Sequence, residues 1–487
     1  MKRFKLFLSS FATLSLMMVS ACSTNPATGQ RQFTALMSPQ QENQIGAQEH
    51  EKIIKQFGLY DDERINAYVE KIGQEVTRDT ERPDVNYKFF VLDSPIVNAF
   101  ALPGGYIYIS RGLLALANSE AEVAAVLAHE AGHITGRHSA ERYSHGVLTS
   151  LGAGILSAVI DSAGAAQALG TGANLYLSSY SRSQENEADS LGLRYMTRGG
   201  YHPDAMPAFL DSLRRQSDLD AQLAGRSSTA GANYFSTHPA TQNRVNQTQA
   251  QAQSYARQGQ NNRDQHLKMI NGMVYGNSAS QGFERSEAFY HPEIGFTFDV
   301  ADGLNVSNQP SRIVASSKSG SVVIFDMASN KEGVSPQSYL KKWMKDRALS
   351  EIETPTVHGR RAATASFESV INNRPTTIRI MAIDWVDAKG VKRFARFQVG
   401  IPQGTGTVQL NALKAMTYSF RSMTAKEQKT IKPIKMKIFT ANADDSVLKY
   451  ARKMPFDKLQ EQRFKVLNAL KENEQLLGGR QYKLLVD

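Results

Sequence analysis

The stretch LAHEAGHITGRH, residues 127–138, contains the spacing His-Glu-x-x-His at His129, Glu130 and His133. It follows SEAEVAAVL, which supplies an N-cap serine and an apolar stripe, so we expect a helix here. Helical positions four apart differ by about 40° around the axis, so the two histidines share one face. Their imidazoles can then bind one metal ion, and the carboxylate of Glu130 can take a proton from metal-bound water. The alternative is an ordinary polar helix face.

A third ligand must come from elsewhere, because a catalytic zinc ion has three protein ligands and one open position for water. The best source is SRSQENEADSLGLRYM, where Glu185 and Asp189 are four apart and share a helical face. We expect Glu185 to ligate and Asp189 to accept a hydrogen bond from a ligand imidazole. Glu187 points roughly 160° away from that face and is the weaker candidate. Taken alone, this stretch would indicate only an acidic, solvated helix face.

The beginning of the chain, MKRFKLFLSSFATLSLMMVSAC, has the composition of an export signal. Three basic residues precede an apolar run that is too short to span a bilayer, which predicts a signal peptide over residues 1–21. The small residues before Cys22 resemble the lipobox of bacterial lipoproteins, which implies lipidation of that cysteine. An aspartate directly after the cysteine usually retains such lipoproteins in the inner membrane, and this position holds Ser23. The resemblance therefore implies an anchor at the periplasmic face of the outer membrane. The alternative is an ordinary cleavage site with an unmodified Cys22.

The cysteine count and the net charge limit the chemistry further. Cys22 is the only cysteine of the 487 residues, so after lipidation no disulfide can form and no thiolate can bind a metal. A metal site must then use histidines and carboxylates. Loss of residues 1–21 removes three basic residues and lowers the formal charge from +10 to +7. A basic surface suits an anionic envelope as well as nucleic acid, but export argues against a nucleic-acid partner.

Composition divides the mature chain into three regions and predicts a multidomain α+β protein. Residues 22–275 show helical periodicity interrupted by one β segment, which predicts a mainly helical, zincin-type peptidase domain with a small β-sheet. Residues 285–425 alternate apolar and polar positions, as in SVVIFDM and TTIRIMAIDW, and predict a β-rich α/β domain. The pattern of this domain is faintly similar to PsbP-like domains, and it holds no cluster of acids or histidines that would indicate its role.

The tail, residues 433–487, predicts the order strand, helix, helix, strand. This order is similar to a LysM-type module, which implies peptidoglycan as a partner. Asp445 and Ser446 stand in place of the usual Asp-Thr pair, and Asp444 replaces the glycine that normally precedes it. The alternative is a generic βααβ docking domain.

A long apolar segment, from Gly146 to Tyr180, is rich in glycine and alanine and carries one charge, at Asp161. A carboxylate at mid-bilayer costs about 2.5 to 3.5 kcal/mol, which argues against a transmembrane helix. Two interpretations stay open, a mobile helix-loop that covers a cleft and a buried helical hairpin.

HEAGHITGRH, followed about fifty residues later by SRSQENEADSLG, is similar to the gluzincin metallopeptidases of the HtpX and CAAX-prenyl-endopeptidase family. The likeness is greatest to the periplasmic BepA-like and LoiP-like branch and covers roughly residues 30–250. The membrane-spanning helices of HtpX-type members and the tetratricopeptide repeats of BepA are not found in this sequence. The resemblance implies one zinc ion per chain and five site residues, namely the ligands His129, His133 and Glu185, the general base Glu130 and the supporting Asp189.

Two further stretches fit the same resemblance. NAFALPGGYIYISRGLL is similar to the family's strand and turn beside the cleft, and its edge at Asn98 and Ala99 would hold substrate as an added strand. FSTHPATQNRV is similar to the family's downstream His-Pro motif and contains His238 and Arg244. Arg244 would bind a substrate carbonyl or pair with an acid of the site.

The resemblance leaves two roles open for His238, a fourth ligand that displaces water or a donor that stabilises the tetrahedral oxyanion. The alternative is a loop histidine in a helix-capping turn. His138 and His145 lie out of register with the ligand face, so we expect both at the surface.

These patterns favour a zinc-dependent endopeptidase of the bacterial envelope that hydrolyses misfolded or misassembled periplasmic and outer-membrane proteins. The alternative is a non-catalytic, chaperone-like scaffold that binds peptidoglycan and keeps a structural zinc. A structural site needs no carboxylate beside the metal, so Glu130 argues against the scaffold. A cell-wall hydrolase would be supported by the tail alone.

Overall fold

The computed structural model describes residues 23–147, 179–224, 238 and 241–487, apart from residues 257 and 346. The signal peptide, Cys22 and most of the apolar segment, residues 148–178, therefore lie outside the described residues. The chain forms two compact units, one combining residues 1–275 with Ile434–Asp487 and the other comprising Gly276–Pro433. Both contain helices and sheets, which confirms the multidomain α+β class. Within the described residues, no helix is long and apolar enough to cross a membrane.

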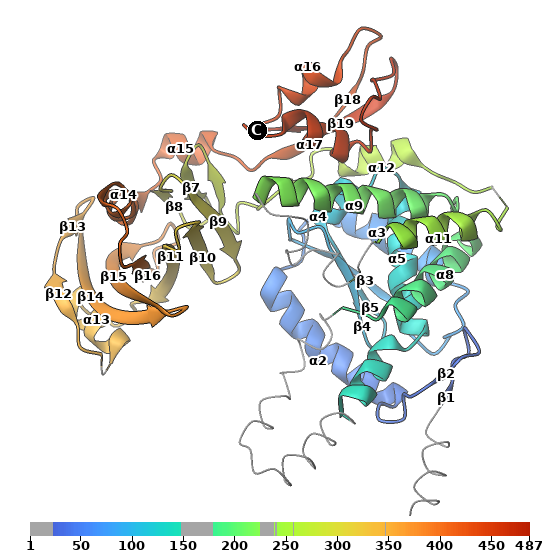
Figure 1. Ribbon diagram of the computed structural model, residues 1–487, viewed down its shortest axis with the longest axis horizontal. Coiled ribbons are helices and arrows are strands. Elements are labelled where there is room, and N and C mark those ends of the chain that lie inside the picture. Colours follow the sequence, from blue (N-terminus) through green and yellow to red (C-terminus); the bar gives the residue numbers. More distant parts are fainter. Residues whose placement is uncertain (1–22, 148–178, 225–237, 239–240, 257, 346) are drawn as a thin grey trace, which may run out of the picture. The chain divides into compact units, whose positions relative to one another are not determined.

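The first unit is built on a three-stranded sheet in the order β3-β5-β4 (Figure 1). Strands β3 (Lys88–Leu92) and β5 (Tyr106–Ser110) are parallel, and β4 (Ala99–Leu102) pairs antiparallel with β5. The β4–β5 turn contains Gly104 and Gly105 at φ of 79° and 95°, a conformation that favours glycine. A separate two-stranded sheet is formed by β1 (Ser23–Thr24) and β2 (Arg31–Gln32).

Helices cover both faces of this small sheet. On one face, Phe89, Val91 and Ile107 join the main core with α3 and α5, whereas on the other Phe100 and Tyr108 pack with α2. Alternation of side chains along each strand produces this division. The helices of the unit outside the tail include α2 (Pro39–Phe57), α3 (Glu63–Thr77), α4 (Arg111–Leu116), α5 (Glu120–Thr135), α8 (Arg182–Arg198), α9 (Ala205–Ala224), α11 (Gln242–Ala252) and α12 (Arg263–Ile270).

Helix α5 is the central helix of the unit, and all of its residues are buried. It begins at the expected cap, where the side chain of Ser119 accepts a hydrogen bond from the backbone N–H of Glu122. Helix α8 begins with a capping box, in which Ser181 and Gln184 satisfy each other's backbone N–H groups. Both helices are thus capped at their first turn, and in α8 this turn contains Glu185, one of the expected ligands.

Two glycines allow α5 and α8 to approach closely. A Cβ atom at Gly132 would lie 2.9 Å from the carbonyl oxygen of Ala188, and one at Gly192 would lie 3.0 Å from the backbone nitrogen of His129. The first distance is shorter than real Cβ atoms show, and the second is shorter than nearly all of their contacts. The absent side chains therefore bring the backbones of the two helices together beside the histidines.

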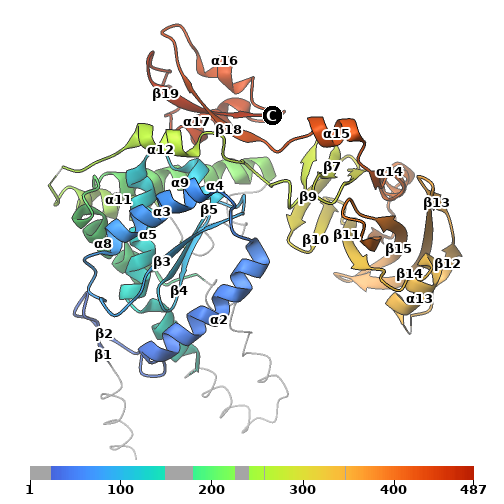
Figure 2. The same cartoon turned by 180° about the vertical axis from the view of Figure 1, so that it is seen from behind.

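The tail belongs to the same unit. It consists of β18 (Lys435–Thr440), α16 (Val447–Ala451), α17 (Gln460–Leu467) and β19 (Gln481–Val486), with β18 and β19 paired antiparallel. Its apolar residues, among them Phe464, Leu467 and Leu485, form one cluster with residues of α3, α5 and α9. Figure 2 shows the tail lying beside α12 and α9. The order strand, helix, helix, strand matches the expectation, and the tail shares the hydrophobic core of the unit.

A buried lysine joins the tail to the helix that precedes α5. The side chain of Lys483, with none of its surface exposed, donates hydrogen bonds to the carbonyl oxygens of Ala115, Leu116 and Ala117 at 2.8, 3.0 and 2.8 Å. These carbonyls end α4, where no helical N–H group remains to bind them and a cation is favoured. Burial lowers the pKa of this amine, and the nearby carboxylate of Glu122 opposes that shift.

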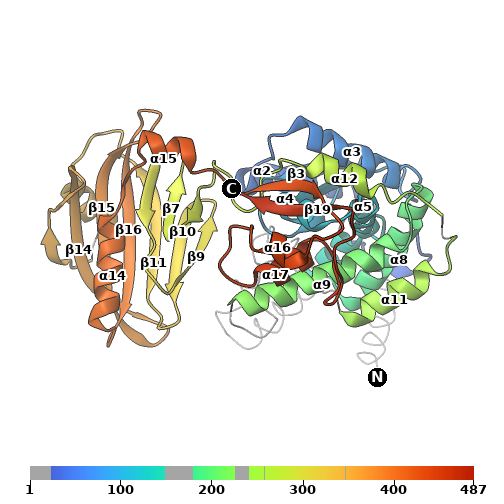
Figure 3. The same ribbon diagram turned by 90° about the horizontal axis from the view of Figure 1, so that it is seen from above.

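The second unit has an eight-stranded sheet that runs β12-β14-β15-β16-β11-β10-β9, with β13 paired to β14, and a four-stranded sheet β17-β8-β7-β6. Helix α13 packs on one face of the large sheet and α14 on the other. Figure 3 shows α14 lying along the strands. The helices are α13 (Pro336–Met344), α14 (Thr407–Tyr418) and α15 (Ala425–Thr430). The strands are β6 (Phe283–Arg285), β7 (Ala288–His291), β8 (Phe296–Asp299), β9 (Leu304–Gln309), β10 (Arg312–Ser317), β11 (Val322–Ser329), β12 (Ser350–Glu353), β13 (Thr356–Val357), β14 (Arg360–Ile371), β15 (Arg374–Val386), β16 (Lys392–Pro402) and β17 (Arg421–Ser422).

Replacement of the buried amine should destabilise the first unit. We expect Lys483→Met to lower the free energy of unfolding by about 1 to 3 kcal/mol, because the buried carbonyls of Ala115 and Leu116 lose this donor and that of Ala117 keeps only His266. Urea unfolding at fixed pH measures the change. Lys437→Met, at an exposed position of the paired strand β18, should change it by less than about 0.5 kcal/mol. Equal effects of the two substitutions would contradict the structural role of Lys483.

Candidate metal centre

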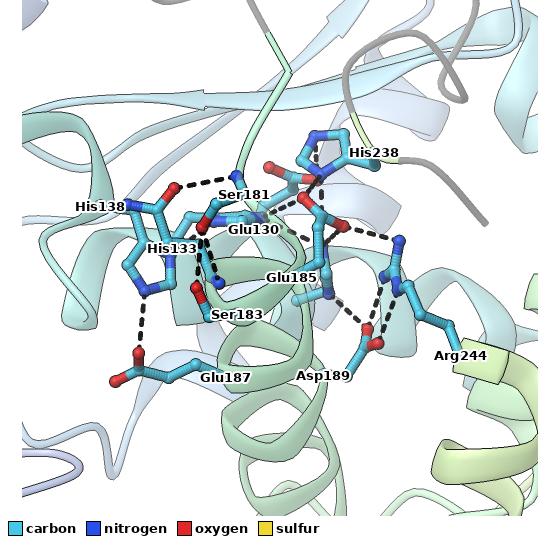
Figure 4. A network of polar contacts seen from close by, with 12 residues as sticks. Glu130, His133, His138, Ser181, Ser183, Glu185, Glu187, Asp189, His238 and Arg244 are labelled. Carbon is cyan, nitrogen blue, oxygen red and sulfur yellow. Dashed lines mark hydrogen bonds and ion pairs between the residues drawn. The ribbon is translucent and has the colours of Figure 1, made fainter. Parts of the chain in front are cut away.

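Two packed helices and one loop residue bring four potential ligands together. His129 and His133 come from α5, Glu185 from the first turn of α8, and His238 from the stretch before α11. Each offers one ligand atom, and these four atoms all lie within 4.8 Å of one another. All four side chains are buried, and Figure 4 shows three of them converging beside Glu130. The three ligands expected from the sequence are therefore adjacent, and His238 lies with them.

The imidazole nitrogens point at a common centre. The Nε2 atom of His129 lies 3.1 Å from Nε2 of His133 and 3.4 Å from Nδ1 of His238. Three ring nitrogens that lie so close together can direct their lone pairs at a single cation. The carboxylate of Glu185 completes the set, with Oε1 2.9 Å from Nδ1 of His238. Imidazoles with one carboxylate form a donor set that suits zinc.

Asp189 and Arg244 contact the candidate ligands and hold their side chains in place. The Nδ1 atom of His129 lies 2.9 Å from Oδ1 of Asp189, the contact expected of a residue that orients a ligand imidazole. Arg244, on α11, donates to both oxygens of Asp189 at 2.8 and 2.7 Å, and its Nη1 lies 2.6 Å from Oε2 of Glu185. Of the two roles considered for Arg244, the structure therefore shows pairing with the acids of the site.

Charge and burial act in opposite directions on these acids. Burial alone would raise the pKa of Glu185, but His238 and Arg244 outweigh it and hold that pKa well below its usual value. The pKa of Asp189 is lowered too, because the Arg244 guanidinium and His129 overcome the effect of burial. Both carboxylates are thus anionic at neutral pH, as a metal ligand and its supporting residue must be.

Glu130 differs from the other acids of the site. Its side chain has none of its surface exposed, and neither carboxylate oxygen accepts a hydrogen bond from any residue that the structure describes. Its Oε1 atom lies 3.6 Å from Nε2 of His238, and burial raises its pKa. Buried carboxylates normally have donors, so one without a donor beside a metal-ligand group is placed to receive a proton from water there.

One expectation from the sequence was wrong. We expected His138 at the surface, but its side chain is completely buried and its Nδ1 lies 2.7 Å from Nδ1 of His133. The reason is that α5 ends at Thr135, and Arg137, at φ 53°, turns the chain back toward the histidine helix. Gly136 was the signal that the sequence offered, because glycine often ends a helix. His145 is exposed, as expected.

The remaining predicted residues lie on the sheet. Ala99 begins β4, which pairs with β5 alone within the described part of the chain and so forms one edge of the sheet. Asn98 precedes it, and its backbone N–H donates to Oγ of Ser110 at 3.1 Å. Neither residue belongs to the four-residue ligand group, and their contact with a substrate stays a prediction.

Residues 63–252 match peptidase family M48. This part of the chain is therefore a peptidase M48 domain, which confirms the resemblance found in the sequence. It contains α5 and α8, the two helices that carry candidate ligands, and α11 with Arg244.

Among curated proteins, the chain is 28% identical over 214 residues to the beta-barrel assembly-enhancing protease of Escherichia coli K12, a match that covers 42% of each chain. It is 33% identical over 191 residues to the mitochondrial metalloendopeptidase OMA1 of Arabidopsis thaliana, covering 39% of this chain and 36% of that protein. The chain thus spans less than half the length of these two relatives. A solved structure of LpqN, a protein involved in cell envelope biogenesis of Mycobacterium tuberculosis, matches 26% of this chain and 83% of its own with 10% identity and a TM-score of 0.22.

Loss of the carboxylate at Asp189 should weaken metal binding. In Asp189→Asn an amide group replaces one of the two oxygens that accept from Arg244 and His129, and an amide N–H cannot accept a hydrogen bond. His129 then loses its firm orientation, and we expect zinc affinity to fall roughly 10- to 100-fold. Competition with a chromophoric chelator measures this affinity. Asp211→Asn, at an acid on α9 that pairs with Arg214, serves as the control and should bind zinc like the wild type.

Proposed function

We propose that the chain is a zinc-dependent endopeptidase of the bacterial envelope, which hydrolyses peptide bonds in misfolded or misassembled periplasmic and outer-membrane proteins. The observation that carries this proposal is the buried carboxylate of Glu130, which has no hydrogen-bond donor in the described structure and lies beside the four-residue ligand group. The M48 domain and the relatives named as proteases support the same reaction class.

The protein groups divide the work of peptide hydrolysis among them. When bound, a zinc ion would polarise the substrate carbonyl and lower the pKa of a water molecule at the open position. Glu130 accepts the proton of that water and passes it to the leaving amine, the general acid–base role for which its burial and raised pKa suit it. His129, His133 and Glu185 would hold the ion, and Arg244 keeps Glu185 fixed by their ion pair.

The edge strand β4 offers a surface to which a substrate peptide can bind. Strand β4 has one pairing partner in the described structure, so an extended peptide can add alongside it by backbone hydrogen bonds. Such recognition reads the peptide backbone and tolerates many sequences. It therefore suits unfolded substrates, and the name of the Escherichia coli relative points to outer-membrane β-barrel proteins among them.

Localisation and attachment form a second part of the proposal. Lipidation of Cys22 would anchor the chain to the outer membrane, as its lipobox-like context suggests. The tail, with its order strand, helix, helix, strand, would bind peptidoglycan in the manner of a LysM module. A chaperone-like scaffold with a structural zinc is not favoured, because it gives the donorless carboxylate of Glu130 no role.

The test of the function is degradation of casein by the mature, unlipidated chain. Glu130→Gln should retain zinc but lose a factor of about 10² to 10⁴ in cleavage rate, because the general base is gone. The control is Glu120→Gln, a buried glutamate of the same helix that bonds to Tyr201 and Asn262, and it should cleave like the wild type. If the wild type binds zinc and neither it nor the His238→Ala variant cleaves, the endopeptidase proposal fails.

His238 requires its own experiment, because it lies within the ligand group and also near Glu130. Its Nδ1 is 2.9 Å from Oε1 of Glu185, which favours the role of a fourth ligand that closes the site. We therefore expect His238→Ala to keep its zinc and to cleave casein faster, because the position for water opens. A loss of activity at unchanged zinc content would instead assign His238 as the oxyanion donor.

A further inference from the structure

The two histidines of α5 have different supports. For His129 the support is direct, through Asp189. The Nδ1 atom of His133 instead lies 2.7 Å from Nδ1 of His138, whose Nε2 lies 3.4 Å from Oε2 of Glu187. Figure 4 shows these three side chains in a row, leading from the ligand group to the side of α8.

The chemistry of this row fixes which nitrogen carries each proton. The ionised carboxylate of Glu187 can only accept, so the proton of a neutral His138 lies on its Nε2. The Nδ1 of His138 is then an acceptor, and the contact at 2.7 Å requires a hydrogen on Nδ1 of His133. The Nε2 atom of His133 is left with its lone pair, and this is the nitrogen that faces Nε2 of His129 at 3.1 Å.

The fold holds this arrangement firmly. A side chain at position 136 would meet the ring of His138 at 2.5 Å, so Gly136 makes room for it. Arg137, whose left-handed backbone makes the turn, is held by its side chain, which donates to Glu42, Thr34 and the carbonyl of Met37 at 3.0, 3.0 and 2.7 Å. These contacts with the start of α2 and the segment before it offset the cost of the left-handed backbone at Arg137.

An aromatic ring covers the other side of the ligand histidine. Tyr180 stacks on His133 with ring centroids 3.7 Å apart and an interplanar angle of 15°. The guanidinium of Arg142 lies over the other face of Tyr180, 3.8 Å from the centroid of the tyrosine ring. With its plane fixed by stacking and its Nδ1 fixed by His138, His133 has one orientation left.

We propose that His138 and Glu187 are positioning residues, which hold His133 in the tautomer and the orientation that bind the metal ion. The inference rests on the proposed function, because it takes the four-residue group to be a zinc site. Helix α8 then supplies a ligand, Glu185, and the acids that support both histidines of α5, Asp189 directly and Glu187 through His138. Ligand imidazoles generally donate the N–H group that does not face the metal. His129 donates it to a carboxylate, and His133 donates it to a second imidazole.

The experiment measures zinc affinity of the mature, unlipidated chain by competition with a chromophoric chelator. His138→Leu should weaken binding roughly 10- to 100-fold. His138→Asn should recover part of the loss, because its Oδ1 can occupy the place of the lost Nδ1 and accept from His133. His266→Leu is the matched control, since His266 is equally buried but bonds to Tyr68 and the carbonyl of Ala117, and it should bind zinc normally.

A double substitution tests whether the two residues act in series. Glu187→Ala, at a side chain with 13% of its surface exposed, should weaken zinc binding by less than His138→Leu. The double variant should bind no worse than His138→Leu alone, because Glu187 acts through the histidine. Additive losses, or affinities equal to that of the wild type, would overturn the inference. Absence of zinc binding by the wild type would instead overturn the proposed function.

Discussion

The close contact between α5 and α8 is the constraint on which the site depends. Gly132 and Gly192 remove the side chains that would separate the two backbones. Ligands and their supporting acids come from both helices, so a wider spacing would draw Glu185 and Asp189 away from the histidines together. Helix packing at ordinary distances of 8 to 10 Å leaves room for side chains between the axes, and here part of that room is used by the metal-binding groups.

Burial gives this site its chemistry and also makes it costly. Three imidazoles and three carboxylates lie in the interior, and an unpaired buried charge would be strongly destabilising. Arg244 offsets much of this cost by pairing with Asp189 and Glu185 at once. Glu130 does not pair with Arg244, and among the three carboxylates it is the one for which neither oxygen accepts a hydrogen bond from a described residue. Such uneven distribution of partners is typical of catalytic centres.

Sequence reasoning was reliable where the chain follows regular helices. The arithmetic of helical faces put His129 with His133 on one face of α5 and Glu185 with Asp189 on one face of α8, because both helices are regular over these positions. It failed at His138, since one residue at positive φ ends the regularity on which the register depends. The role of Lys483 was equally hidden. A lysine in a predicted strand indicates solvent, and only the long-range packing of the tail shows that this amine lies in the core.

The position of Lys483 has a consequence for the order in which the protein can be completed. Its amine binds the carbonyl of Ala115 across 368 positions of sequence, and contacts so distant along the chain form late, after long segments between them have been made. The carbonyls at the end of α4 have this buried cation only once β19 is present, although α5 and α8 come hundreds of residues earlier in the chain. A chain cut short before β19 would keep every ligand and lack the support beneath the histidine helix. The support of the helix that carries the candidate ligands thus depends on a strand encoded hundreds of residues after it.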